Sequence, residues 1–134
     1  MSSTISIEKD ILRNKAFRTL SSTAKTAYTD FLMKRTLRKS KRLGWVCTNN
    51  GQIEFTYSEA LKKGYSRRSF RDALDQLIER GFIDIAHLGS GGWKGDKNLY
   101  SISDRWRDFG TDDFKPMERP KDRRKGIGFQ KKHR

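Results

Sequence analysis

The sequence predicts an α+β domain, with a core of three helices, an N-terminal β-hairpin and a C-terminal pair of strands joined by a glycine-rich loop. Three observations support this. Residues 66–80 have the periodicity of a long amphipathic helix. Two further helical patterns occur at residues 23–38 and 57–63. Strand patterns interrupted by glycine-containing turns occur at residues 45–55 and 82–102. We therefore expect one domain over residues 21–114, an N-terminal segment of residues 1–20, and a basic tail of residues 115–134 that is disordered alone.

The other elements are organised around the helix at residues 66–80. Its apolar residues recur at the i, i+3, i+4, i+7, i+8 spacing of one buried helical face: Phe70, Ala73, Leu74, Leu77 and Ile78. Ser66 can cap the N-terminus of this helix, and Gly81 can end it. We therefore expect a core helix with one face in solvent.

Charge is distributed unevenly along the solvent face of this helix. Arg67, Arg68 and Arg71 lie in the first turns, and the acidic residues follow further along. Positive charge at a helix N-terminus opposes the macrodipole, which favours acidic side chains there. The arrangement therefore indicates an anionic partner at the N-terminal end.

The preceding helix, at residues 23–38, is capped by Ser21 or Ser22 and ends in a basic run. No acidic residue occurs between positions 31 and 53, and the run consists of Lys34, Arg35, Arg38, Lys39, Lys41 and Arg42. These cations either contact phosphate groups or are simply solvated, since cations are also favourable at a helix C-terminus.

Residues 45–55 predict a β-hairpin, because Asn50-Gly51 is typical of a two-residue type I′ turn that needs a positive φ at both positions. Cys47, in the first of the two strands, is expected to be a small buried residue and not a reactive thiol. No histidine lies near it in the sequence to activate it.

The short helix at residues 57–63 begins with a capping-box pattern, in which Glu59 follows Thr56 by three residues. Ala60 and Leu61 are expected to point inwards, and a turn at Gly64 leads to the long helix. A short helix, a glycine-containing turn and a longer amphipathic helix are the order of a helix-turn-helix.

A glycine-rich loop, residues 89–98, separates the strands expected at residues 82–88 and 99–102. Its candidates for nucleic-acid contact are Trp93, Lys94 and Lys97. In the alternative, Trp93 folds back and covers apolar surface of the sheet. The loop is not a nucleotide-binding loop, because it lacks the G-K-[ST] ending and does not precede a helix.

The last part of the chain divides at residue 115. Residues 103–114 are expected to form a short helix or turn that docks Trp106 and Phe109, or else to present these aromatic rings as a dimer contact. The tail has nine basic residues against two acidic ones, a balance of +7 that is half of the chain's +14, and it contains Arg123, Arg124 and Lys125. Such a tail increases affinity for nucleic acid through counterion release, unless it is only solvated.

The composition favours a polyanionic partner. The chain has 134 residues and a formal net charge of +14, and only 34% of its residues are hydrophobic. The alternative is a ribosome-associated or simply basic soluble protein. A single cysteine, the lack of an apolar run of membrane-spanning length and the lack of a signal-peptide core lead us to expect a cytoplasmic, nucleoid-associated protein.

No pattern of an enzyme is present in the sequence. His87, His133 and Cys47 do not have metal-ligand spacing, and no nucleophile lies beside a base. The acidic residues near Asp104 fit a capped turn better than a magnesium site. We therefore expect no catalytic residue, metal, cofactor or small-molecule substrate.

From residue 21 to residue 106 the order of elements resembles the winged helix-turn-helix superfamily. Within this superfamily, the chain is similar to the DNA-binding domains of bacterial and phage replication initiators and of small transcription regulators. The resemblance is carried by FTYSEALKKGYSRRSFRDALDQLIERGFIDI and by the strand–wing–strand sequence LGSGGWKGDKNLYSI. The basic run and the hairpin at residues 45–55 depart from the commonest pattern of the superfamily.

The resemblance implies that the helix at 66–80 inserts in the major groove of double-stranded DNA, with the wing, residues 89–98, beside it. Ser66, Arg67, Arg68, Ser69 and Arg71 would then contact base edges or phosphates, since arginine suits both. The implied function is transcription regulation or phage- or plasmid-type DNA replication, by a monomer or a homodimer. The alternatives are an RNA- or ribosome-associated winged-helix protein and a protein-interaction module.

Overall fold

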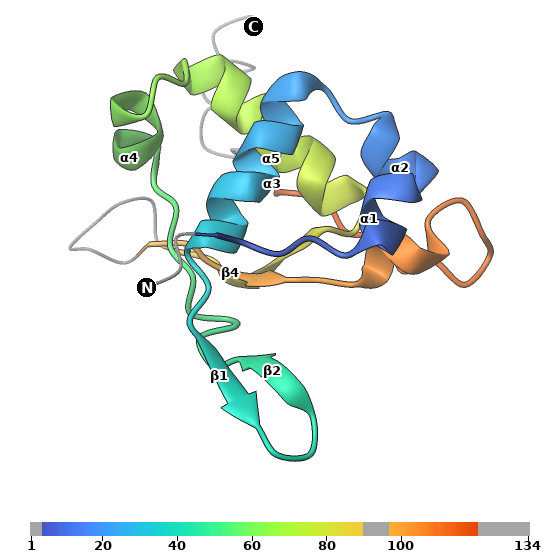
Figure 1. Cartoon of the computed structure of the whole chain (residues 1–134). Coiled ribbons are helices and arrows are strands. Elements are labelled where there is room, and N and C mark those ends of the chain that lie inside the picture. Colours follow the sequence, from blue (N-terminus) through green and yellow to red (C-terminus); the bar gives the residue numbers. More distant parts are fainter. Residues whose placement is uncertain (1–3, 90–96, 121–134) are drawn as a thin grey trace, which may run out of the picture.

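The structure is a computed structural model that describes residues 4–89 and 97–120. Within these residues the fold is α+β, with five α-helices and two small antiparallel sheets. The helices gather on one side of the β3–β4 sheet, and the β1–β2 hairpin projects away from both (Figure 1). The predicted fold class is therefore confirmed at the level of α+β.

The N-terminal segment packs on the body of the protein. It forms two short helices, α1 (Lys9–Arg13) and α2 (Lys15–Arg18), and the side chain of Asn14 caps α2 by accepting a hydrogen bond from the N–H of Ala16 at 2.8 Å. Ile11, Ala16 and Leu20 are buried in the same hydrophobic core as the later helices. Residues 4–20 therefore help to form the core.

Helix α3 (Ser22–Met33) is shorter than the predicted helix at residues 23–38. Its start is as expected, because the hydroxyl of Ser21 accepts a hydrogen bond from the N–H of Ala24 at 3.1 Å. Its end is set by Asn49, whose side chain donates to the carbonyl of Lys34 and accepts from the N–H of Thr36, both at 2.9 Å. Because Asn49 binds these backbone groups, the chain leaves the helix there.

Helix α5 (Arg67–Glu79) confirms the predicted long helix. The five predicted core residues, Phe70, Ala73, Leu74, Leu77 and Ile78, are each 2% exposed or less. The ring of Phe70 lies 4.7 Å from that of Phe55 and within 5.4 Å of two tyrosine rings. Helices α3 and α5 pack against each other, and this contact is the centre of the core.

Helix α4 (Tyr57–Lys62) begins at the predicted cap, because the hydroxyl of Thr56 accepts from the N–H of Glu59 at 3.1 Å. The second half of the capping box is missing, since the Glu59 carboxylate pairs with Lys34. Ala60 is buried as predicted, but Leu61 is exposed. Gly64 has a φ of +105° and turns the chain from α4 into α5.

The second sheet pairs β3 (Ile83–His87) with β4 (Leu99–Ile102) in antiparallel register. Ile53 adds an antiparallel bridge on the other side of β4. Its carbonyl accepts from the N–H of Tyr100 at 2.8 Å, and its N–H donates back at 3.2 Å. Strand β4 therefore lies between β3 and residue 53.

The prediction of a hairpin at residues 45–55 is wrong. The hairpin consists of β1 (Leu37–Ser40) and β2 (Gly44–Cys47), so the basic run forms its first strand and its turn. Asn50-Gly51 lies outside it, although Gly51 does have a positive φ, +88°. The Asn50 side chain pairs with the backbone of Ile102, donating at 3.1 Å and accepting at 2.7 Å, so it attaches the chain to β4.

After β4 the chain docks on the core through a single-turn 3₁₀ helix, Arg105–Asp108. Trp106 is buried and stacks on Phe82, as predicted, but Phe109 is exposed and pairs with Phe114. Arg105 holds this region together. It pairs with Asp84 at 2.6 Å and donates to the backbone carbonyls of residues 78, 83 and 115.

Residues 115–120, in the tail that was expected to be unstructured, make specific contacts. Met117 packs against the core, and Arg119 binds both carboxylate oxygens of Asp75 on α5, at 2.6 and 3.2 Å. This attachment could not be predicted from the sequence, because an arginine in a basic tail belongs to no periodic pattern.

Candidate nucleic-acid interface

The N-terminal end of α5 is held rigidly by its cap. The hydroxyl of Ser66 accepts from the N–H of Ser69 at 3.0 Å, and the hydroxyl of Ser69 accepts from the N–H of Ser66 at 3.1 Å. This is a reciprocal capping box in which a serine takes the usual place of glutamate. The hydroxyls of both serines form the cap and fix the backbone here, and the expected contact of these serines with nucleic acid stays a prediction.

The three arginines of this helix end have no carboxylate partner among the described residues. Arg68 is exposed and lies opposite the buried face, and Arg71 is half-buried on its edge. The guanidinium group of Arg67 lies 5.4 Å from the centre of the Tyr57 ring, a cation–π contact that draws it towards α4. Arg68 and Arg71 are therefore the more available cations.

The C-terminal half of the same helix carries the opposite charge. Asp72 and Glu79 are exposed, and Asp75 is neutralised by Arg119. Gln76 is hydrogen-bonded to Ser21 at the start of α3, with distances of 2.9 and 3.1 Å. Only the N-terminal end of α5 therefore presents unpaired positive charge to an anionic ligand.

The β1–β2 hairpin is a second basic region. The predicted basic run divides here, because Lys34 is paired with Glu59 and Arg35 donates to the carbonyls of residues 6 and 32. The next four cations, on β1 and in the turn, are exposed and make no ion pair with a described residue: Arg38, Lys39, Lys41 and Arg42.

Sequence reasoning missed one member of this region, Trp45. It is the cross-strand partner of Lys39, and the two lie on one face of the hairpin together with Leu37 and Cys47. Cys47 is half-buried, not buried as predicted, because neither face of the hairpin packs on the core. A strand without a buried face leaves no alternating pattern, so the charge run itself was the only available signal.

The two basic regions lie apart. In Figure 1 the α4–α5 turn is at one end of the molecule and the tip of β1–β2 at the other, with the β3–β4 sheet between them. Lys97, before β4, is exposed and pairs with Glu54 at 3.4 Å. The other predicted contact residues, Trp93, Lys94, Arg123, Arg124 and Lys125, lie outside the described residues.

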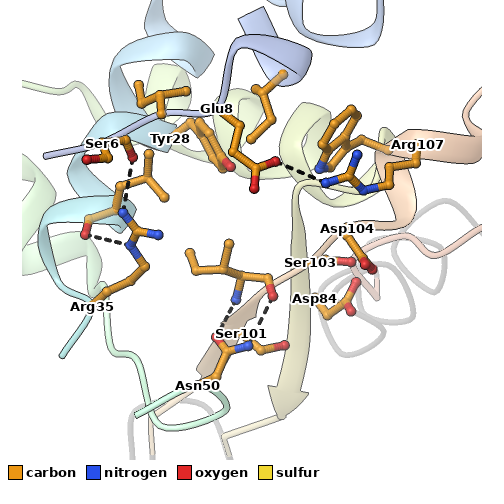
Figure 2. Close-up of a pocket in the computed structure, with 15 residues that line it drawn as sticks. Ser6, Glu8, Tyr28, Arg35, Asn50, Asp84, Ser101, Ser103, Asp104 and Arg107 are labelled. Carbon is orange, nitrogen blue, oxygen red and sulfur yellow. Dashed lines mark hydrogen bonds and ion pairs between the residues drawn. The ribbon is translucent and has the colours of Figure 1, made fainter. Parts of the chain in front are cut away.

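A cavity of about 600 Å³ opens between the N-terminal segment, α3 and β4 (Figure 2). Its wall carries both signs of charge. Arg107 pairs with Glu8 at 3.0 Å, and Arg35 is bound by backbone carbonyls. Burial raises the pKa of Tyr28, whose hydroxyl faces this cavity, to about 12. Because its cations are already engaged, this cavity adds little to an anion-binding surface.

Two features are missing from the described part of the chain, a metal-binding group of side chains and a membrane-spanning helix. No group of three or more histidine, cysteine, aspartate or glutamate residues there could hold a metal ion. Nor does any described helix combine the length and the apolar character that crossing a membrane requires.

Comparison with known proteins gave no match. No protein-family model, curated protein or solved structure matches this chain at a significant level.

Proposed function

We propose that the chain binds double-stranded DNA as a winged-helix protein, with the N-terminal end of α5 in the major groove. The observation that carries the proposal is this end itself, where Arg67, Arg68 and Arg71 have no carboxylate partner among residues 4–89 and 97–120. The helix is anchored by its cap and its core face. Such a helix can offer arginine side chains in a fixed direction, which bidentate contact with guanine requires.

The order of elements supports a winged-helix arrangement. Helix α3 is followed by the bridge at Ile53, then by α4, α5, β3, a loop and β4. Because β4 lies between residue 53 and β3, the loop at residues 89–98 would be the wing of a small three-stranded arrangement. Helices α4 and α5 are joined by a short turn, as in a helix-turn-helix.

Electrostatics favours an anion at this position. Arginines in the first turn oppose the macrodipole at a cost of roughly 0.3–1 kcal/mol each at most. A phosphate group bound there would interact favourably both with the helix terminus and with the guanidinium groups. The acidic second half of α5 would be repelled by the DNA backbone, so we expect only the N-terminal end to enter the groove.

The biological role that we propose is transcription regulation or participation in phage- or plasmid-type DNA replication. The tail contributes to both through charge, since residues 121–134 contain seven basic residues and one acidic residue. A chain that ends at Pro120 should bind all DNA sequences more weakly by a similar factor, because counterion release carries no sequence information.

The test is a selection of bound sequences from a pool of duplex DNA, with structured RNA as competitor, at several salt concentrations. We expect an enriched DNA motif for the wild-type protein and its loss in the double variant Arg68→Gln, Arg71→Gln. The matched control is Lys9→Gln, Arg13→Gln, which removes the same charge from α1. Preference for RNA, or equal loss in the control, would contradict the proposal.

A further inference from the structure

The β1–β2 hairpin keeps its shape without a hydrophobic core. It projects from the body (Figure 1), and none of its residues belongs to the core or packs against it. An isolated two-stranded hairpin is marginally stable in water. Side-chain hydrogen bonds at its base and at its turn stabilise it instead.

At the base, the carbonyl oxygen of the Asn49 side chain accepts from the N–H of Thr36 at 2.9 Å and from the thiol of Cys47 at 3.2 Å, while its amide donates to the carbonyl of Lys34 at 2.9 Å. At the turn, the hydroxyl of Ser40 accepts from the N–H groups of residues 42 and 43, both at 3.2 Å. Both ends of the hairpin are therefore fixed before any ligand binds, which lowers the entropic cost of binding.

The surface of this preformed hairpin combines positive charge with exposed apolar groups. Four cations on β1 and in the turn make no ion pair within the described part of the chain. Leu43 in the turn is 77% exposed and Trp45 on β2 is 67% exposed. A basic surface explains solubility, but it does not explain two large apolar side chains in water at the far end of a projecting element.

We infer that β1–β2 is a DNA-bending arm that enters a minor groove further along the duplex that α5 binds, with Leu43 as an apolar wedge against the base pairs. The inference rests on the proposed DNA binding by α5 and adds a second contact to it. Lys41 and Arg42 directly precede Leu43, so they can bind the phosphates that border the narrow groove while the leucine faces its floor.

The choice of the minor groove follows from the chemistry of the tip. Leucine has no polar atom with which to read base edges in the major groove, but it can separate stacked base pairs, and such wedges kink DNA. Four-residue strands with a rise of about 3.3 Å per residue give an arm of roughly 13 Å, enough to reach across a groove. Trp45, behind the tip, can cover the sugars beside the opened step.

The separation of the two basic regions also favours bending. Because the tip of the hairpin and the N-terminal end of α5 lie at opposite ends of the molecule (Figure 1), one duplex touches both more easily if it curves around the protein. Contact with the arm would offset the energy of the bend.

The test measures bending and salt dependence together, on duplexes of about three helical turns with a donor and an acceptor dye at their ends. The variants are Leu43→Ser, a hairpin variant with glutamine at positions 38, 39, 41 and 42, and the α5 variant Arg68→Gln, Arg71→Gln. The charge-matched control carries glutamine at positions 9, 13, 15 and 18, on α1 and α2. Thermal unfolding confirms that each variant folds.

We expect energy transfer to rise when the wild-type protein binds, and Leu43→Ser to abolish most of the rise while weakening binding by less than about fivefold. The hairpin variant should bind at least about tenfold more weakly at physiological salt, with a slope of log affinity against log salt that is smaller by about 3. The control should match the wild-type protein.

The outcomes separate the arm from the proposed function. If the α5 variant loses affinity but Leu43→Ser and the hairpin variant behave as the wild-type protein does, the arm is wrong and DNA binding by α5 stands. If the wild-type protein does not bind duplex DNA, both fail. Tighter binding to single-stranded DNA than to duplex would also overturn the arm if it quenches tryptophan fluorescence in a Trp93→Phe background and the quenching disappears when Trp45→Phe is added. The aromatic ring of Trp45 would then stack on unpaired bases.

Discussion

Helix α5 and the β1–β2 hairpin both carry cations that have no carboxylate partner among the described residues, but they present them in opposite ways. Helix α5 buries one whole face, and its cations lie on a rigid support whose shape depends on the core. The hairpin buries nothing in the core and is held by hydrogen bonds of two polar side chains, Asn49 and Ser40. The DNA binding that we propose for α5 should therefore depend on the folding of the core, whereas the binding that we propose for the hairpin should depend on it very little.

This difference separates stability from binding in the two regions. A change inside α5 should alter stability first and DNA binding as a consequence. A change in the exposed hairpin should leave the stability of the body almost unchanged and affect only the ligand. The predictions below test this separation, from the largest expected effect to the smallest.

The largest difference in stability between the two regions is expected when an aromatic ring is truncated in each. Phe70→Ala should lower the free energy of unfolding by about 3–5 kcal/mol, because the ring is fully buried among three other aromatic rings. Trp45→Ala should change it by less than about 0.5 kcal/mol, because the indole lies in water. Urea unfolding measures both, and a large loss with Trp45→Ala would show that the hairpin packs on the body.

A glycine in each region has a positive φ, and the two differ in their surroundings. A Cβ at Gly81, after α5, would lie 2.5 Å from the backbone nitrogen of Trp106, so Gly81→Ala should cost about 3 kcal/mol. Gly44 in the hairpin has a φ of +74° and open space, so Gly44→Ala should cost about 1 kcal/mol, and only locally. Thermal unfolding gives the comparison, and similar losses for the two variants would contradict it.

Alkaline pH should destabilise the core and not the hairpin, which contains no tyrosine. Burial raises the pKa of Tyr28 to about 12, above the value near 10 of an unfolded tyrosine. The resulting stability is complete below pH 10 and is lost as the pH rises towards 12, because the unfolded chain ionises first. The loss attributable to Tyr28 is roughly 2 kcal/mol.

The variant Tyr28→Phe should therefore show a shallower decline in unfolding free energy between pH 10 and 12. Burial and a hydrogen bond to Asp30 also raise the pKa of Tyr65, so part of the decline should remain in this variant. Chemical denaturation at a series of pH values measures it, and an unchanged slope would show that Tyr28 ionises alike in both states.

The smallest effect concerns two serines with similar local roles. Ser66→Ala removes the cap of α5 and should cost about 1 kcal/mol of global stability. Ser40→Ala removes the two hydrogen bonds of the hairpin turn and should lower global stability by less than about 0.5 kcal/mol. Amide hydrogen exchange separates them, since only Ser40→Ala should accelerate exchange in the hairpin while leaving α5 protected.

The same contrast explains which elements the sequence could predict. The buried face, cap and end of α5 were predicted residue by residue, because each follows from a local rule: the helical period, a serine cap and a glycine with positive φ. The hairpin was misplaced because the strongest local signal, Asn50-Gly51, serves another purpose. The side chain of Asn50 pairs with Ile102, 52 residues away, and no local rule contains that contact.

The residues of the candidate site also differ in whether the sequence could reveal them. The arginines of α5 and the four cations of the hairpin could be found from charge, but the exposure of Leu43 and Trp45 could not. Apolar residues are normally assigned to a core, and only the three-dimensional structure shows that residues 37–47 contribute nothing to it. The attachment of Arg119 to Asp75 is likewise a long-range contact that no local pattern predicts.

The most direct test of the account is a hydroxyl-radical footprint on a selected duplex, with wild-type protein, the hairpin variant and the α5 variant. We predict two protected regions, of which the hairpin variant loses the flanking one and the α5 variant loses the region at the selected motif. Protection at the motif that survives Arg68→Gln with Arg71→Gln would contradict the central claim, that the N-terminal end of α5 reads the DNA.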